Sequence, residues 1–180
     1  MKVDFFIVGA PKARTTSIHE YLKNHVQVFM SEQKEINFFS SKAILNQGLY
    51  YKNKICSELT RYLSFFSESV NFKIIGESSV SYLFYKNTAE KIHQFNPNAK
   101  ILIILRNPIE RAFSHYLMDK RLGHTKSDFN SIIRNENKEK NQDLLFQQHV
   151  LVGKYYDQIK RYVNLFGNNV LLMQYSELTS

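Results

Sequence analysis

The stretch "DFFIVGAPKARTTSIHEYL", residues 4–22, joins a short apolar run to a segment with helical periodicity. The apolar run ends at Gly9, and a turn with Lys12 and Arg14 leads into three hydroxyl residues at 15–17. A helix that begins there directs N–H groups and its positive end toward the turn, where they attract phosphate. An ordinary N-cap explains one hydroxyl, but not three beside two cations. The stretch therefore predicts a strand, a phosphate-binding turn and a helix.

Three more apolar runs follow, and the four together predict the strands of one sheet. Their expected positions are residues 4–9, 72–76, 100–105 and 169–174. Runs that are apolar throughout suit strands buried on both faces of a parallel sheet, and helical patterns separate them. The order predicts an α/β fold: a single P-loop-type domain with a central, mainly parallel sheet flanked by helices.

Five segments between and around these runs carry helical signals. They are 16–25, 58–67, a segment that opens with a capping box of Asn87 and Glu90, 111–122 after Pro108, and 152–166. In the fourth of these helices the spacing of Arg111 lets it face solvent or carboxylates, and we expect an exposed charge. We expect His115 to pack or hydrogen-bond locally.

A second candidate anion site follows the third apolar run. In a parallel sheet, ligands bind outside the carboxyl ends of the strands. Arg106 stands at such an end, and Ser114 follows eight residues later on the next helix. One helical turn rises about 5.4 Å, so a loop and two turns can bring both side chains toward one anion.

Composition narrows the class of partner. The chain has 24 Lys and Arg against 16 Asp and Glu, a net charge of +8, which favours an anionic ligand. Cys56 is the single cysteine, so no disulfide forms within the chain, in agreement with a reducing compartment. We see no signal peptide, and the longest aliphatic run, at 101–105, is too short to span a bilayer. We therefore expect a cytoplasmic protein.

The joint pattern resembles the PAPS-dependent sulfotransferases. The matching segments are "PKARTTS" (11–17), "KEINFF" (34–39), "GESSVSYLF" (76–84), "LRNPIERAFSHY" (105–116) and "YYDQIKRYVNLFGNNVLLMQYSEL" (155–178). The segment at 34–39 is most similar to the branch that sulfates carbohydrates, heparan sulfotransferases included.

The resemblance implies a role for each matching residue. The donor would be 3′-phosphoadenosine 5′-phosphosulfate (PAPS), with no metal, and the acceptor a carbohydrate-like hydroxyl or amine. Lys12 would bind the 5′-phosphate and stabilise the charge on the leaving oxygen. Glu35 would remove the proton from the acceptor. Arg106 and Ser114 would bind the 3′-phosphate. The residues implied to hold the 5′-phosphosulfate are Lys12, Ala13, Arg14, Thr15, Thr16 and Ser17.

The chain departs from the family pattern in two places. Arg14 stands where the family has a glycine, which lets the backbone approach the phosphates. Family members also continue beyond the position of Ser180 with more helices and a basic loop. We therefore expect residues 1–180 to form one sulfotransferase-like domain that lacks the C-terminal part of the family fold.

Two other classes of function compete with this interpretation. A P-loop kinase or NTPase should show Gly-Lys before its Ser or Thr and a strand-end Asp for magnesium, but Ala13-Arg14, Glu77 and Asn107 stand at those places. A non-catalytic polyanion-binding module should cluster cations with exposed aromatic residues on one face. The expected partners are a nucleotide and an acceptor, without nucleic acid or a membrane span.

Overall fold

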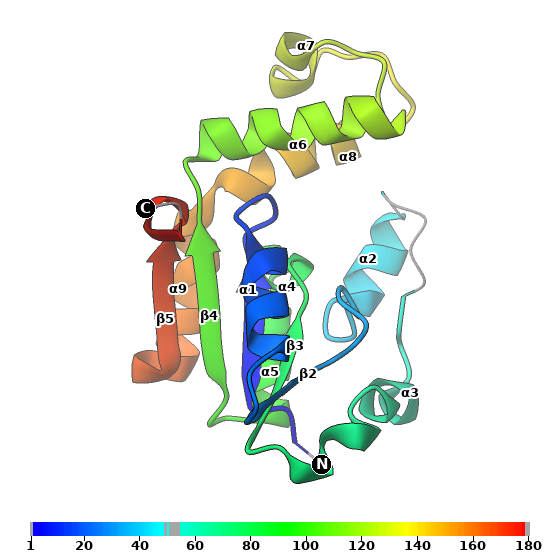
Figure 1. Cartoon of the computed structure of the whole chain (residues 1–180). Helices are drawn as coiled ribbons and strands as arrows, with labels where there is room; N and C mark the ends of the chain where they lie inside the picture. The colour runs from blue at the N-terminus through cyan, green and yellow to red at the C-terminus, as the bar shows by residue number, and fades with distance from the viewer. Residues whose placement is uncertain (1, 49, 51–54, 179–180) are drawn as a thin grey trace.

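A parallel sheet forms the centre of the computed structural model, which describes residues 2–48, 50 and 55–178 (Figure 1). Within these residues the sheet has five strands in the order β2-β3-β1-β4-β5, and every neighbouring pair is parallel. The strands are β1 (Phe5–Gly9), β2 (Val28–Met30), β3 (Ile74–Ser78), β4 (Lys100–Leu105) and β5 (Val170–Gln174). The predicted α/β fold is confirmed.

The edge of the sheet formed by β2 and β3 differs from the sequence prediction. The three-residue strand β2 was not expected, and β3 begins at Ile74 rather than at residue 72. Ile74 is the first residue of β3 with a partner, because Val28 lies opposite it. Phe72 and Lys73 precede this pairing and are exposed. The apolar run therefore predicted that β3 exists, but pairing with β2 determines where β3 begins.

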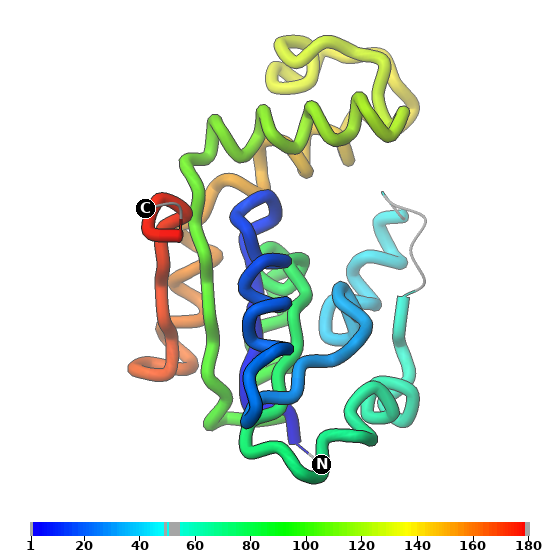
Figure 2. The backbone as a smooth tube through the Cα atoms, in the orientation of Figure 1, coloured from blue at the N-terminus to red at the C-terminus, as the bar shows by residue number. Residues whose placement is uncertain are grey.

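Helices cover both faces of the sheet and its carboxyl edge (Figures 1 and 2). One face carries α1 (Thr15–Lys23), and the other carries α4 (Ser81–Phe84), α5 (Thr88–Phe95) and α9 (Tyr155–Phe166). Beyond the β2 edge lie α2 (Ser41–Gln47) and α3 (Leu59–Ser64), and across the carboxyl edge lie α6 (Pro108–Leu122), α7 (Phe129–Ile133) and α8 (Gln142–His149). Short 3-10 turns complete the chain: η1 (Ser67–Asn71), η2 (Leu151–Gly153), η3 (Gly167–Asn169) and η4 (Tyr175–Leu178).

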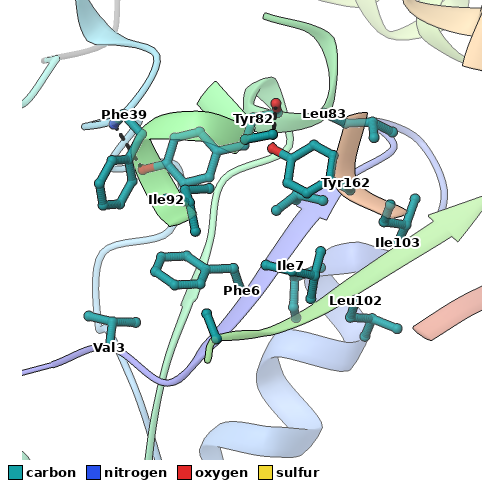
Figure 3. Close-up of a cluster of buried hydrophobic side chains, with 14 of the residues drawn as sticks. Val3, Phe6, Ile7, Phe39, Tyr82, Leu83, Ile92, Leu102, Ile103 and Tyr162 are labelled. Carbon is teal, nitrogen blue, oxygen red and sulfur yellow. Dashed lines mark hydrogen bonds between the residues drawn. The ribbon is translucent and has the colours of Figure 1, made fainter. Parts of the chain in front are cut away.

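The core lies on both faces of the sheet, and Figure 3 shows part of it. Phe6 and Ile7 of β1 are fully buried on opposite faces of the sheet, each contributing about 2 kcal/mol of burial free energy. Tyr162 of α9 donates its hydroxyl to the carbonyl of Tyr82 at 2.8 Å. This bond satisfies a buried phenol and ties α9 to α4, the helix that follows β3.

The start of α6 is set by its own sequence, whereas the start of α5 is not capped as predicted. Asn107 accepts hydrogen bonds from the amides of Ile109 and Glu110, at 3.0 and 3.3 Å, and Pro108 occupies the first turn. Asn87 is the N-cap residue of α5, but its side chain makes no cap hydrogen bond. The predicted capping box with Glu90 is therefore wrong.

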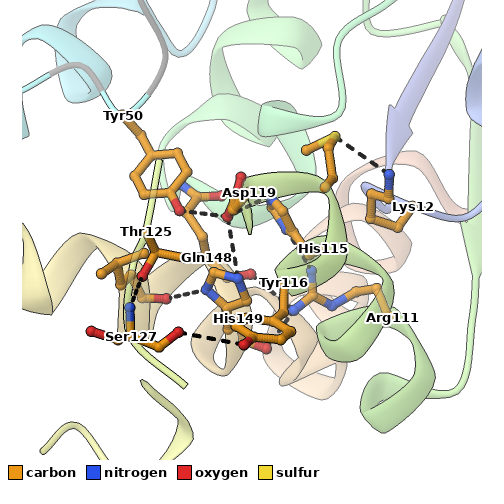
Figure 4. Close-up of polar contacts among 12 residues, drawn as sticks. Lys12, Tyr50, Arg111, His115, Tyr116, Asp119, Thr125, Ser127, Gln148 and His149 are labelled. Carbon is orange, nitrogen blue, oxygen red and sulfur yellow. Dashed lines mark hydrogen bonds and ion pairs between the residues drawn. The ribbon is translucent and has the colours of Figure 1, made fainter. Parts of the chain in front are cut away.

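Arg111 is fully buried, so the prediction that it faces solvent is wrong. Its guanidinium donates to the carbonyl of Gln148 at 2.8 Å, to the carbonyl of His149, and lies 3.2 Å from Nδ1 of His115 (Figure 4). Gln148 and His149 form the C-terminal end of α8, where a cation is favourable. Arg111 thereby fixes α6 against α8.

Candidate active site

The turn after β1 holds two residues in a left-handed conformation. Lys12 has φ 68° and Arg14 has φ 62°. Such a backbone favours glycine, so Arg14 adopts it at a cost of about 1 kcal/mol. The side chain of Arg14 extends away from the turn, where one guanidinium nitrogen donates to the carbonyl of Leu178 at 3.3 Å. The Arg14 guanidinium also lies 5.4 Å from the ring centre of Tyr175. The turn thus keeps the conformation expected of a glycine-containing loop, and the arginine adds a contact to η4.

Lys12 and Arg106 lie next to each other, which joins the two predicted anion sites. Arg106 donates to the carbonyl of Lys12 at 3.2 Å, and its guanidinium lies 4.5 Å from the ring centre of Tyr175. The ammonium of Lys12 lies 3.4 Å from the sulfur of Met118 on α6. Partial burial, followed by the nearby charge of Arg121, lowers the pKa of Lys12, while Asp119 opposes this shift. The two cations form an electropositive corner, in which the carboxylate of Glu110 lies 3.4 Å from Nε of Arg106.

Glu35 is held at the end of β3 by the backbone. Its carboxylate accepts the amide of Val80 at 2.9 Å and pairs with the ammonium of Lys34. Its own amide donates to the carbonyl of Ser78 at 2.9 Å, and its φ is 59°. These contacts fix a partly exposed carboxylate at the same edge of the sheet as the cations.

The loop that carries Glu35 is itself anchored on both sides. The next residue, Ile36, is fully buried and accepts the amide of Cys56 at 3.4 Å. The following residue, Asn37, donates its amide to the hydroxyl of Ser79 at 3.0 Å. Cys56 is 2% exposed, and its thiol donates to the carbonyl of Glu58 at 3.6 Å. The Glu35 loop is therefore packed between the chain at 56 and the end of β3.

A buried carboxyl lies beneath this loop. Glu77 is fully buried and accepts three hydroxyl hydrogen bonds of 2.7 Å each, from Tyr62, Ser79 and Tyr82. Burial raises the pKa of Glu77 to about 7, although the three hydroxyl donors act in the opposite direction. Because Ser79 also accepts the amide of Asn37, Glu77 supports the Glu35 loop through a single intervening side chain.

A second buried carboxylate connects α6 to the chain after α2. Asp119 is fully buried and accepts the hydroxyl of Tyr50 at 2.5 Å (Figure 4). Nε2 of His149 lies 3.2 Å from the same carboxylate, and Nε2 of His115 lies 3.8 Å from it. Burial lowers the pKa of His115 to about 3, so this ring is neutral at physiological pH. The predicted local packing of His115 is confirmed.

One cavity of about 870 Å³ brings most of the predicted site residues together. The predicted residues that line it are Lys12, Arg14, Thr15, Thr16, Glu35, Arg106 and Ser114. Ala13 and Ser17 do not line it. Ala13 is fully buried in the core, and Ser17 is exposed outside the cavity. The cavity also has lining residues that the sequence interpretation did not select, among them Lys34, Asn37 and Tyr175. Tyr175 directly follows β5, so the rule that ligands bind at strand ends could have found it.

Within residues 2–48, 50 and 55–178, no group of three or more His, Cys, Asp or Glu is placed to hold a metal ion. The same part of the chain contains no helix long and apolar enough to cross a membrane.

The fold and the site together define an α/β protein with a cation-lined cavity at the carboxyl edge of a parallel sheet. Residues 2–180 match the model of the sulfotransferase domain, and the chain belongs to this family. The predicted family resemblance is thus confirmed.

Several known proteins are similar to the chain. A crystal structure of a sulfotransferase from Alicyclobacillus acidocaldarius superposes with a TM-score of 0.86 at 31% identity, over 99% of this chain and 75% of that one. The membrane-associated sulfotransferase kil1 of Dictyostelium discoideum is 33% identical over 63% of this chain and 22% of its own length. Human carbohydrate sulfotransferase 15 is 29% identical over 69% of this chain and 28% of its own length. The matched region spans about a quarter of these two curated relatives.

Proposed function

We propose that this protein moves a sulfuryl group from PAPS to a hydroxyl or amine of an acceptor. The observation that carries the proposal is the single cavity lined by Lys12, Thr15, Thr16, Glu35, Arg106 and Ser114. Relatives named as carbohydrate and heparan sulfate sulfotransferases support a carbohydrate-like acceptor. The protein would thus carry out the family's reaction with the residues that the sequence resemblance implies.

In the proposed reaction the acceptor oxygen attacks sulfur while the bond between sulfur and the bridging phosphate oxygen breaks. Glu35 takes the acceptor proton, and Lys12 stabilises the negative charge that develops on the leaving phosphate. Thr15 and Thr16 at the start of α1 hold the 5′-phosphate end of the donor. The products are the sulfated acceptor and 3′-phosphoadenosine 5′-phosphate (PAP).

Arg106 and Ser114 are proposed to bind the 3′-phosphate, which distinguishes this donor from ATP. Arg106 suits this role because the carbonyl of Lys12, the ring of Tyr175 and the carboxylate of Glu110 hold its guanidinium beside the turn. Ser114 faces the same cavity from α6. A phosphate there would lie near both the charge of Arg106 and a hydroxyl donor.

The experiment compares the binding of PAP, AMP and ATP by calorimetry and thermal shift. We expect the wild type to prefer PAP to AMP and Arg106→Ala to lose that preference. A charge-assisted hydrogen bond contributes about 1.5–3 kcal/mol, roughly a tenfold to hundredfold loss in PAP affinity.

The control is Arg134→Ala, which removes an exposed arginine that does not line the cavity. This variant should bind all three nucleotides like the wild type. A wild type without preference for PAP, or an Arg106→Ala variant that keeps it, would contradict the assignment of the 3′-phosphate site.

A further inference from the structure

Arg14 carries a charged side chain at a position where the backbone favours glycine. Its φ of 62° is left-handed, and in this conformation a Cβ atom comes too close to the neighbouring backbone. A glycine, which the sulfotransferase pattern has at this position, would avoid that contact. The backbone therefore gains nothing from the arginine, and a role for Arg14 has to come from the contacts of its guanidinium.

The guanidinium of Arg14 lies beside two other residues that follow strands. β1, β4 and β5 are neighbours in the sheet, and Arg14, Arg106 and Tyr175 come after them in that order. Figure 1 shows the turn after β1 and the red turn η4 on either side of the end of β4. The guanidinium carbons of Arg14 and Arg106 lie 5.4 and 4.5 Å from the centre of the Tyr175 ring, so they are less than 10 Å apart. All three residues line the same cavity.

The guanidinium of Arg14 keeps donors for a ligand. Among the described residues it makes one hydrogen bond, to the carbonyl of Leu178 at 3.3 Å, and no carboxylate lies within 4 Å of it. A guanidinium has five N–H donors, so most of them remain for another acceptor. Arg14 is exposed, and its long side chain can turn toward an anion beside Arg106. A phosphate near both guanidiniums would also reduce the repulsion between their charges.

We propose that Arg14 is a second arginine of the 3′-phosphate site and strengthens the preference of this protein for 3′-phosphorylated nucleotides. The inference rests on the proposed function, in which Arg106 and Ser114 bind that phosphate. It adds a specificity-determining residue whose donors a glycine could not supply. Arg14 is assigned to the 3′-phosphate rather than to the 5′ end because its guanidinium shares the Tyr175 ring with Arg106. Two arginines can each donate charge-assisted hydrogen bonds to one phosphate.

The test replaces Arg14 by the glycine of the family pattern. Calorimetry measures the Kd of PAP and the Kd of AMP, which lacks the 3′-phosphate, for the wild type and for Arg14→Gly. We expect PAP to bind roughly tenfold or more weakly and AMP to change by less than about threefold, as for the loss of one charge-assisted hydrogen bond. The melting temperature should change little, because glycine relieves the left-handed strain while the contacts with η4 are lost. A purely structural role would lower the melting temperature and weaken both nucleotides alike.

Two further variants separate the guanidinium from the backbone. Arg14→Lys keeps a positive charge but loses the planar fork of donors, so it should retain part of the preference for PAP. Asn135→Gly is the matched backbone control, because Asn135 is also left-handed, with φ 58°, and does not line the cavity. It should bind PAP and AMP like the wild type. If Asn135→Gly changed the ratio of the two Kd values as Arg14→Gly does, the guanidinium would not be the cause and the inference would be wrong.

The outcomes separate this inference from the proposed function. If the wild type prefers PAP, Arg106→Ala loses that preference and Arg14→Gly keeps it, the inference is wrong and the proposed function stands. An equal loss of PAP and AMP binding in Arg14→Gly also overturns the inference, because Arg14 would then act at the 5′ end or on the fold. If the wild type does not distinguish PAP from AMP, the proposed function fails and the inference fails with it.

Discussion

Glu35 and Lys12 line one cavity, but their proposed roles differ: Glu35 takes a proton and Lys12 stabilises negative charge. Glu35 is positioned by the Val80 amide, so its replacement by Gln keeps the shape of the loop and removes the base. We expect Glu35→Gln to bind PAP like the wild type while kcat falls by roughly a hundredfold or more. Lys12→Ala should weaken both PAP binding and kcat, because its charge acts in the ground state and in the transition state.

Single-turnover kinetics with an accepted substrate, together with PAP calorimetry, separate the two effects. Glu35→Gln and Lys12→Ala serve as controls for each other, so a change outside the cavity, such as Gln33→Glu, is not needed. A Glu35→Gln variant with near-normal turnover would remove Glu35 from the mechanism.

Glu77 gives the protein a pH dependence of stability at the residue scale. Burial raises the pKa of Glu77 from 4.5 to about 7, so the native protein holds this proton more tightly than the unfolded chain. The resulting stability is fully present below about pH 4.5 and is lost as pH rises through about 7. At 1.36 kcal/mol per pKa unit, the loss is on the order of 3 kcal/mol.

Urea unfolding at pH 4.5 and pH 8.5 measures this contribution. The free energy of unfolding should fall between the two values by about 3 kcal/mol more in the wild type than in Glu77→Gln. Glu90→Gln, an exposed carboxyl on α5, should behave like the wild type. Equal pH dependence in all three proteins would mean that Glu77 does not titrate in this range.

At the scale of elements, the approach of α4 to β1 determines the shape of the site. A Cβ atom on Gly9 would lie 2.8 Å from Cβ of Leu83 and 2.9 Å from its Cδ2. The Cβ of Leu83 cannot rotate away, so Gly9→Ala must push α4 outward. Val80, which holds Glu35, directly precedes this helix.

We expect Gly9→Ala to destabilise the fold by about 1–3 kcal/mol, which lowers the melting temperature by roughly 2–4 °C per kcal/mol. Turnover should fall even at temperatures where the variant remains folded, because the Val80 amide moves with α4. Differential scanning calorimetry and the PAP-release assay measure the two effects. An unchanged melting temperature would show that α4 is not held by this contact.

The elements also show which features could be predicted from the sequence. The four apolar runs gave four strands at nearly the expected positions. For β1, β3 and β4 the reason is that strands buried inside a sheet need continuous apolar residues, whereas β5 lies at the edge and exposes Leu171 and Leu172. The short edge strand β2 has no such requirement and was missed. Arg111, His115 and Asp119 follow one another at intervals of four residues, so they share a face of α6, and this spacing could have indicated their burial together.

At the scale of the whole molecule, the cavity is assembled from segments far apart in the chain. Its donor end could be predicted, because Lys12 and Arg106 follow strands and strand ends meet at one edge of the sheet. The other end of the cavity could not be predicted, because Ile44, Phe84 and Leu122 lie on three different helices whose packing the sequence pattern does not show. Only the folded positions of α2 and α6 reveal that Ile44 and Leu122 line the same space.

Because Cys56 is buried, the rate at which its thiol is labelled measures how often the chain around it opens. The chain has one cysteine, and burial raises the pKa of its thiol, so a maleimide should react slowly with the native protein. Because the Cys56 amide bonds to Ile36, next to Glu35, labelling requires the chain around the Glu35 loop to open. If the open form does not bind PAP, a concentration one hundred times Kd should slow labelling by roughly a hundredfold. Mass spectrometry of the labelled protein over time would therefore follow access to the site without an introduced cysteine. An unchanged rate would show that opening near Cys56 is independent of the nucleotide.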